Sequence, residues 1–397
     1  MTERIDYDMD STARAVDSNL YSCEGGLYIH IAFCRKKCIY CDFYSVGDRK
    51  ADWHGYIDSL IAELNNKRGQ LPHKLRTIYI GGGTPSLIPP DEFKRLSVAL
   101  RPYLSDVEEF TLEVNPDDVS PALIALWKEA GVNRLSMGIQ SFDDRMLAAI
   151  NRRHSATGAL DAYGMCRKAF DNISIDLIYG LPGQTMEMWR RDVEKAISLR
   201  PSHISAYSLM YEPGTALTLL RDRGAVEEVE EATEEEMMRF LVDSLRKAGY
   251  EHYEISNFAL LGCRSIHNSS YWHQVPYLGL GPSAHSYDGR RVRSANVADI
   301  KGYIRYWKGE DHAVAVSTEE CLSDTELREE YVMTRLRTRE GIDMADFRKR
   351  FGLKEYNRLL ENSRMYLAEG NLILSDGFMS LSEEAIFISD TVILNLA

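Results

Sequence analysis

The amino-acid sequence predicts an α/β fold of parallel strands joined by helices, followed by a smaller, mainly helical region. Two observations support this prediction. Short apolar runs rich in β-branched residues alternate with longer helical patterns between Leu27 and Leu209, and such alternation is typical of parallel strands with helical crossovers. Beyond Asn296 the pattern changes to consecutive helices and a short hairpin.

The first region has six strand patterns separated by helical ones. The strand patterns cover residues 27–33, 77–80, 109–114, 134–139, 173–179 and 203–209. The helical patterns cover residues 52–64, 91–104, 121–130, 156–170 and 186–199. Six units suit an incomplete, TIM-like (β/α)6 barrel better than a closed barrel of eight. We therefore expect an open barrel with a lateral mouth.

The second region predicts a small helical domain. Helical patterns cover residues 324–338, 343–351 and 355–369, and residues 372–374 and 378–381 flank a turn at Asp376-Gly377. This order resembles a winged helix, a module that binds DNA or serves as an interaction or lid domain. The net charge of −13 favours the second role. We expect an N-terminal arm at 1–26, a core domain at 27–295 and the C-terminal domain at 296–397.

Composition restricts the class of protein. The hydrophobic content of 44% and charged content of 27% are ordinary for a soluble globular protein. The first residues lack the apolar core of a signal peptide, and no run is long enough to span a membrane. The acidic charge disfavours a nucleic-acid partner. Seven cysteines, three of them clustered, fit a reducing compartment, so we expect a cytoplasmic protein.

The cysteine cluster is the strongest chemical signal. Cys34, Cys38 and Cys41 form a C-x3-C-x2-C run just after the first predicted strand. Three thiolates on one loop can hold three irons of a [4Fe–4S] cluster. The fourth iron then stays open and can chelate the amino and carboxylate groups of S-adenosylmethionine (SAM). Two alternatives remain: a zinc site with His30 as fourth ligand, or closure of the open iron by Cys23.

Other polar residues follow the ends of the predicted strands. Gly81-Gly82-Gly83-Thr84-Pro85 follows the second strand, Glu113 ends the third, Gln140 follows the fourth, and Asp176 lies in the fifth. In parallel β/α folds the carboxyl ends of the strands form the ligand site. The glycines allow close backbone approach to a ligand. Each residue alone is compatible with a structural role, but their shared placement predicts one site.

These motifs together resemble the radical SAM superfamily and, within it, the oxygen-independent coproporphyrinogen oxidase family, most of all its HemW-type branch of haem chaperones. The resemblance extends from Leu27 to the C-terminus. It includes Tyr28-x-His30, Gln140-Ser141-Phe142, Asn151-Arg152 and the run 175–182. The oxidase has a further cysteine where this chain has Phe43. The resemblance implies SAM contacts at Tyr28, Tyr40, Gly82, Gly83, Thr84, Glu113, Gln140, Arg152 and Asp176, and it leaves catalytic residues unassigned.

A histidine motif distinguishes the chaperone branch. His267-Asn268-Ser269-Ser270-Tyr271-Trp272 matches its signature. A neutral imidazole at His267 is a suitable axial haem ligand, Asn268 would orient it, and Tyr271 and Trp272 would flank the porphyrin. The alternative is a loop cap with packed aromatic residues. His285, in the glycine-rich segment that follows, is a lesser ligand candidate.

The resemblance therefore implies a haem chaperone that carries a [4Fe–4S] cluster, SAM and haem. The implied partners are haem-accepting proteins, with transient contact to membrane acceptors, and an electron donor such as flavodoxin or ferredoxin; a homodimer is compatible with the motif. The main alternative function is oxidative decarboxylation of coproporphyrinogen III. A radical SAM enzyme acting on RNA is disfavoured by the acidic charge.

Overall fold

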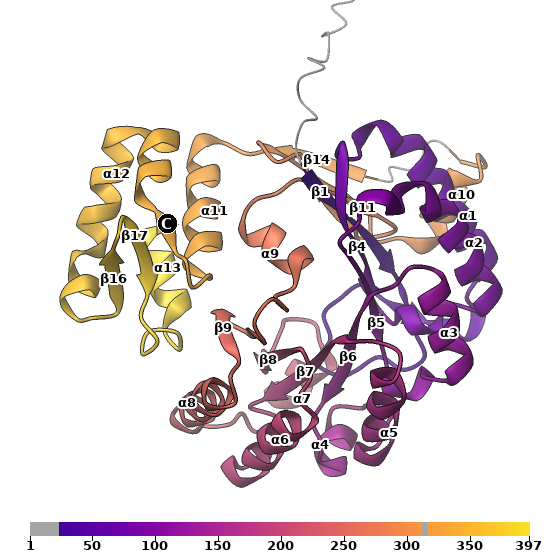
Figure 1. Cartoon of the computed structure of the whole chain (residues 1–397), viewed down its shortest axis with the longest axis horizontal. Coiled ribbons are helices and arrows are strands. Elements are labelled where there is room, and N and C mark those ends of the chain that lie inside the picture. Colours follow the sequence, from indigo (N-terminus) through magenta and orange to yellow (C-terminus); the bar gives the residue numbers. More distant parts are fainter. Residues whose placement is uncertain (1–23, 312–316) are drawn as a thin grey trace, which may run out of the picture.

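A twelve-stranded sheet forms the centre of the molecule in the computed structural model, which describes residues 24–311 and 317–397 (Figure 1). The strand order is β14-β13-β12-β11-β1-β4-β5-β6-β7-β8-β10-β9. The strands are β1 (Glu24–Ile31), β4 (Lys74–Gly82), β5 (Glu109–Val114), β6 (Arg134–Gln140), β7 (Asn172–Tyr179), β8 (His203–Ser208), β9 (Glu251–Glu254), β10 (Asn257–Ala259), β11 (Tyr277–Leu280), β12 (His285–Tyr287), β13 (Val292–Asn296) and β14 (Ser317–Cys321). A short parallel pair, β2 (Phe33–Cys34) and β3 (Val46–Gly47), lies outside this sheet.

The six strands predicted from the sequence are β1 and β4–β8, and they pair in parallel as expected. β11 adds a seventh parallel strand beside β1, whereas β10 and β12–β14 are antiparallel. Among the described residues the edge strands β14 and β9 do not pair with each other. The partial, open barrel is therefore confirmed.

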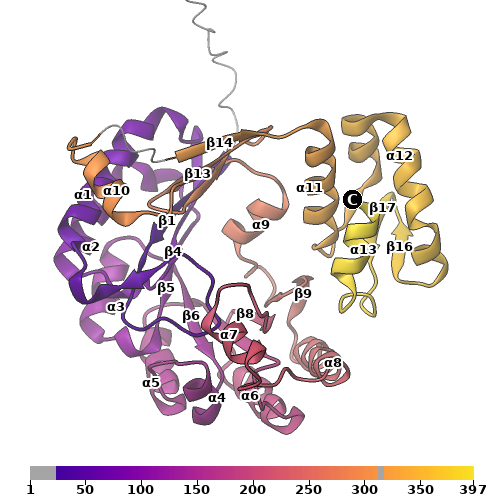
Figure 2. The same ribbon diagram turned by 180° about the vertical axis from the view of Figure 1, so that it is seen from behind.

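Most helices of this part of the chain cover the outer face of the curved sheet, whereas α9 lies on its open, concave side (Figures 1 and 2). The helices are α1 (Trp53–Asn66), α2 (Pro90–Leu100), α3 (Pro121–Glu129), α4 (Asp144–Ala149), α5 (Ala156–Arg167), α6 (Met186–Leu199), α7 (Ala216–Asp222), α8 (Glu231–Lys247), α9 (Ile266–Trp272) and α10 (Ile300–Trp307). Side-chain caps fix several starts; for example, the Thr185 side chain accepts from the Met188 amide at the start of α6. The apolar helix faces and the strands share one buried core.

The C-terminal part has its own apolar core. It contains α11 (Asp324–Leu336), β15 (Ile342–Asp343), α12 (Met344–Ala368), β16 (Leu372–Ser375), β17 (Phe378–Leu381) and α13 (Ser389–Leu396). A capping box between Ser323 and Glu326 starts α11. Gly352, at a φ of 83°, divides α12 into two segments, which match two of the predicted helices. The predicted succession of helices and hairpin is confirmed.

Two elements beyond Asn296 associate with the barrel. α10 packs against α1, and β14 pairs with β13 in the large sheet. The domain boundaries expected from the sequence stay a prediction. No helix in the described ranges has the length and hydrophobicity required to cross a membrane.

Candidate functional site at the carboxyl end of the barrel

The cysteine loop leaves β1 at the carboxyl end of the parallel strands. Cys34 is buried in β2, while Cys38 and Cys41 are partly exposed. None of the three forms a disulfide. The amide of Leu217 donates to the carbonyl of Ile39, which ties the loop to α7 at 2.9 Å. The three sulfur atoms are therefore presented on one anchored loop.

Side chains from two other elements support the thiols. The Thr84 hydroxyl donates to Cys34 Sγ at 3.5 Å, and Arg152 Nη1 donates to Cys38 Sγ at 3.5 Å. Asn151 Nδ2 donates to the carbonyl of Lys37 at 2.8 Å. Asn151 holds a φ of 65°, a conformation that is uncommon outside glycine and is often retained at functional sites. The Asn151-Arg152 pair thus fixes the loop and places a cation beside it.

These residues fit a [4Fe–4S] cluster. Three free thiols are available, and a guanidinium stabilises thiolate charge. Arg152 Nε is buried without a hydrogen-bond partner, so this cation still has a donor to offer. Within residues 24–311 and 317–397, no three or more His, Cys, Asp and Glu side chains are arranged to hold a single metal ion. The thiolates of a cluster bind different irons, so a cluster does not require such a group. Cys23 lies outside the described residues.

The glycine-rich segment adjoins the cysteine loop. Gly82 has a φ of 109°, and a Cβ atom there would lie 2.6 Å from the His30 imidazole. The Gly83 amide donates to the carbonyl of Ile31 at 2.7 Å, which joins this segment to β1. Only glycine permits both the backbone angle and the close approach at position 82. His30 itself contacts Tyr28 and the carbonyl of Tyr44, at 3.0 and 2.9 Å.

Two carboxyl groups face the barrel interior near this end. Glu113 accepts from the Tyr79 hydroxyl at 2.8 Å and from the Gly82 amide at 3.1 Å. Burial nevertheless raises the pKa of Glu113 to about 7. Burial likewise raises the pKa of Asp176 to about 6, against the stabilising effect of Arg134 and the Ser136 hydroxyl. Both groups would favour a cationic ligand, which restores their ionised form.

Gln140 and Arg152 lie together at the end of β6. Arg152 Nη2 donates to the carbonyl of Gly138, and a Cβ atom on Gly138 would meet both the Gln140 amide and this guanidinium. Gln140 has a φ of 70°. Asp192 of α6 accepts from the Ser141 hydroxyl and the Phe142 amide, both at 2.7 Å. This contact fixes the turn that follows Gln140.

Tyr40 is partly buried beside Cys38 and Arg152, and its removal from solvent raises the pKa of its phenol. Tyr28 lies further inside, with its ring 6.5 Å from that of His267. The structure therefore brings the predicted SAM contacts to one end of the barrel, around the cysteine loop. Tyr28 lies between this end and the histidine motif.

The histidine motif forms α9 and lies at the opposite, amino end of the strands. Glu109, the first residue of β5, accepts from the backbone amides of Ile266 and His267 at 2.8 and 3.0 Å. His267 is 2% exposed, and its two ring nitrogens contact the Thr77 and Tyr271 hydroxyls, each at 2.8 Å. Burial lowers the pKa of His267 to about 3, so the ring is neutral.

The other motif residues have different surroundings. Thr77 and Tyr271 orient the His267 ring, a role that the sequence had suggested for Asn268. The Arg337 guanidinium lies 5.0 Å from the Trp272 ring centre, and Trp272 Nε1 is buried without a partner. His285 is exposed on β12. The next histidine, His273, is exposed, and its Nδ1 contacts the Ser269 carbonyl at 2.7 Å.

Several supporting residues were missed from the sequence: Tyr79, Glu109 and Asp192. Each is a buried polar residue that contacts a motif from another element. Of the residues that support the cysteine loop, Asn151 and Arg152 could be found from the sequence, because they form a marker of the family.

Comparison with known proteins agrees with these motifs. Residues 28–196 match the radical SAM superfamily, and residues 322–388 match the HemN C-terminal domain. Haem chaperone HemW of Lactococcus lactis is 39% identical, covering 82% of this chain and 84% of the relative. HemW of Bacillus subtilis is 36% identical, covering 91% and 94%.

A solved structure shows the same fold. Coproporphyrinogen III oxidase (HemN) of Escherichia coli superposes with a TM-score of 0.80, covering 95% of this chain and 90% of the other at 20% sequence identity. That identity is low enough that the likeness concerns the fold alone. Because the curated relatives align over most of both chains, this protein belongs to the HemW family of haem chaperones within the radical SAM superfamily.

Proposed function

We propose that this protein binds a [4Fe–4S] cluster, SAM and haem, and delivers haem to acceptor proteins. The observation that carries the proposal is the loop of three free cysteines at the carboxyl end of the barrel, with Arg152 donating to Cys38. The names of the relatives, which are haem chaperones, favour this function over decarboxylation of coproporphyrinogen.

Cys34, Cys38 and Cys41 would hold the cluster, which when bound supplies a low-potential electron and an open iron for the amino and carboxylate groups of SAM. This chain's residues would bind and orient the nucleoside. Gly82 and Gly83 allow this segment to pack closely against His30 and Phe33 beside the cysteine loop. Glu113 and Asp176 offer negative charge to a cation. Gln140 and Arg152 would complete the contacts at the end of β6.

Haem would bind at α9 through His267, with Asn268, Tyr271 and Trp272 around it. In the structure both nitrogens of His267 are engaged, so its coordination to iron requires release of the Tyr271 or Thr77 hydroxyl. His273 is a second candidate on the same helix end. Its Nδ1 donates to a backbone carbonyl, which leaves Nε2 as the free lone pair, the arrangement common in metal-ligating histidines.

The partners and location form the finer part of the proposal. A low-potential donor such as flavodoxin or ferredoxin would reduce the cluster, and the protein would act in the cytoplasm, with transient contact to membrane-bound haem acceptors. A homodimer is part of the same proposal. Size-exclusion chromatography with light scattering, with and without the cluster, would test the last point.

The decisive experiment combines two assays on one anaerobically reconstituted preparation. A haem titration followed by visible absorbance should show one haem bound per chain. The same preparation, given SAM and a reductant, should leave coproporphyrinogen III unchanged. Conversion to protoporphyrinogen without stoichiometric haem binding would contradict the proposal and establish the alternative function.

A further inference from the structure

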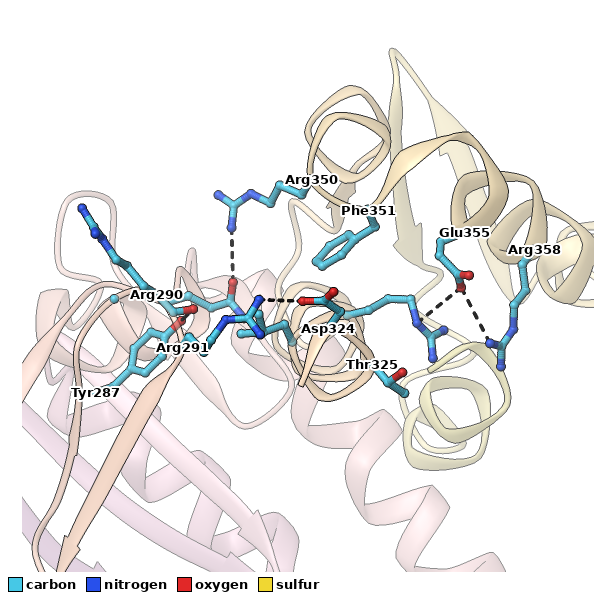
Figure 3. A pocket seen from close by; sticks show the side chains of 13 residues that line it. Tyr287, Arg290, Arg291, Asp324, Thr325, Arg350, Phe351, Glu355 and Arg358 are labelled. Atoms are coloured by element: carbon cyan, nitrogen blue, oxygen red, sulfur yellow. Dashed lines mark hydrogen bonds and ion pairs between the residues drawn. The ribbon is translucent and has the colours of Figure 1, made fainter. Parts of the chain in front are cut away.

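An arginine-rich cavity lies between the barrel and the C-terminal helices. Its volume is about 580 Å³, within the range of ligand pockets in proteins. The turn between β12 and β13, the start of α11 and both segments of α12 surround it (Figure 3). Its lining includes the five arginines Arg290, Arg291, Arg328, Arg350 and Arg358.

Positive charge exceeds negative charge in this lining. The carboxyl groups of the cavity are those of Asp324 and Glu355. Asp324 pairs with Arg291 at 2.5 Å, while one oxygen of Glu355 faces both Arg328 and Arg358 at 3.5 and 3.7 Å (Figure 3). These last two separations exceed ordinary hydrogen-bond lengths. In a chain of net charge −13, such a concentration of arginine favours an anionic ligand.

The buried member of this set is Arg328, which is 5% exposed. It also contacts Glu329 at 3.2 Å, so the guanidinium is held in place from outside the cavity. Arg350 is held in a similar way by Asp346 at 2.8 Å. Fixed guanidinium groups bind carboxylates well, because their planar donors match the two carboxylate oxygens.

The cavity also has apolar walls. Phe351 and Leu327 line it from α12 and α11, and the buried ring of Tyr287 lines it from β12. The Tyr287 hydroxyl donates to the carbonyl of Arg290 at 3.1 Å, which ties the ring to the turn. A ligand that combines a flat apolar body with carboxylates would match both kinds of wall.

The cavity adjoins the histidine motif. Gln274 lines it and follows the last residue of α9, Trp272, by two positions. Arg350 Nη1 donates to Gln274 Oε1 at 3.4 Å, so α12 and the end of α9 are linked at the cavity wall (Figure 3). Gln274 has a φ of 55°, and the chain turns there from α9 toward β11.

We propose that this arginine cavity binds the propionate carboxylates of the haem cargo. The inference rests on the proposed haem-binding function and specifies which residues recognise the acidic edge of the porphyrin. Arg350 and Arg358 are the best residues to test, because their side chains are 46% and 53% exposed and their loss leaves no buried charge unpaired in the core.

The test compares haem with haem dimethyl ester, in which both propionates are blocked, in the same detergent solution. The double variant Arg350→Gln/Arg358→Gln should bind haem about tenfold more weakly than the unmodified protein, while its affinity for the ester stays unchanged. The control variant Arg364→Gln/Arg239→Gln removes the same charge from exposed arginines of α12 and α8 that pair with helical neighbours. It should bind both ligands normally.

Two results would overturn this inference without contradicting the proposed function. One is unchanged haem affinity in the double variant; the other is an equal loss for haem and for the ester, which would indicate a structural effect. Cluster content and thermal unfolding of each variant identify misfolded protein independently. If the unmodified chain bound neither haem nor its ester, the proposed function itself would fail together with the inference.

Discussion

The two ends of the barrel differ in how many bonds their key side chains already make. At the carboxyl end, Arg152 contacts Cys38 and Gly138 yet keeps a buried Nε without a partner. At the amino end, both nitrogens of His267 are engaged, and Glu109 accepts from two amides of α9. The carboxyl end therefore keeps a free donor beside the cysteine thiols, whereas at the amino end His267 must exchange a bond before it can bind iron.

The largest expected effect tests the independence of the two ends. Cys38→Ala removes one of three thiolates, so the reconstituted protein should lose its iron–sulfur absorbance and its bound iron and sulfide. Haem binding at the other end should persist. Cys321→Ala, which changes an exposed thiol on β14, is the matched control and should keep the cluster. Normal iron and sulfide content in Cys38→Ala would rule out this ligand assignment.

A smaller effect is expected from Glu113→Gln, which tests whether the carboxyl end is prepared for a cation. The pKa of Glu113 is raised from 4.5 to about 7, so the folded chain binds more protons than the unfolded chain between these values. Its contribution to stability is therefore present at low pH and is lost as the pH rises through 7. Without SAM, the difference in the free energy of unfolding between the variant and the unmodified protein should shift in favour of the variant by on the order of 3 kcal/mol between pH 4 and pH 8.

Urea unfolding of both proteins at pH 4 and pH 8 measures this shift. Subtracting the difference between the two proteins at pH 4 from that at pH 8 removes any pH-independent effect of the lost hydrogen bonds. SAM affinity should fall about tenfold or more, because the variant offers no negative charge to the cationic ligand. The same stability difference at both pH values would show that Glu113 is ionised normally in the folded protein.

The contrast between the ends also explains what the sequence could predict. The strands and helices depend on patterns within a few residues, and the structure confirms them. The cysteine spacing is also a local pattern, and its role as a cluster site stays a prediction. Tertiary contacts were beyond such patterns. The Asn151 side chain reaches the Lys37 carbonyl across 114 residues of chain, and Glu109 reaches the His267 amide across 158. No local spacing indicates contacts of this kind.

The histidine motif shows a second limit. Residue types suggested a ligand in His267 and an orienting partner in Asn268, and both roles are chemically reasonable. The sequence could not reveal that both nitrogens of His267 already contact hydroxyl groups, because Thr77 comes from a strand 190 residues earlier. His273 is not part of a sequence motif, although this exposed histidine is the more accessible of the two ligand candidates, His267 and His273.

The smallest expected effect decides between these histidines. Tyr271→Phe removes the hydroxyl that contacts His267 Nε2 at 2.8 Å but keeps the aromatic ring. If His267 binds iron by exchanging this bond, the variant no longer has to break it, and haem affinity should rise about fivefold for a bond worth about 1 kcal/mol. If His273 is the ligand, Tyr271→Phe should leave haem affinity unchanged, while His273→Ala should weaken it. Haem titrations of the two variants beside the unmodified protein measure this difference, and a weaker affinity in Tyr271→Phe would show that the phenol itself contributes to haem binding.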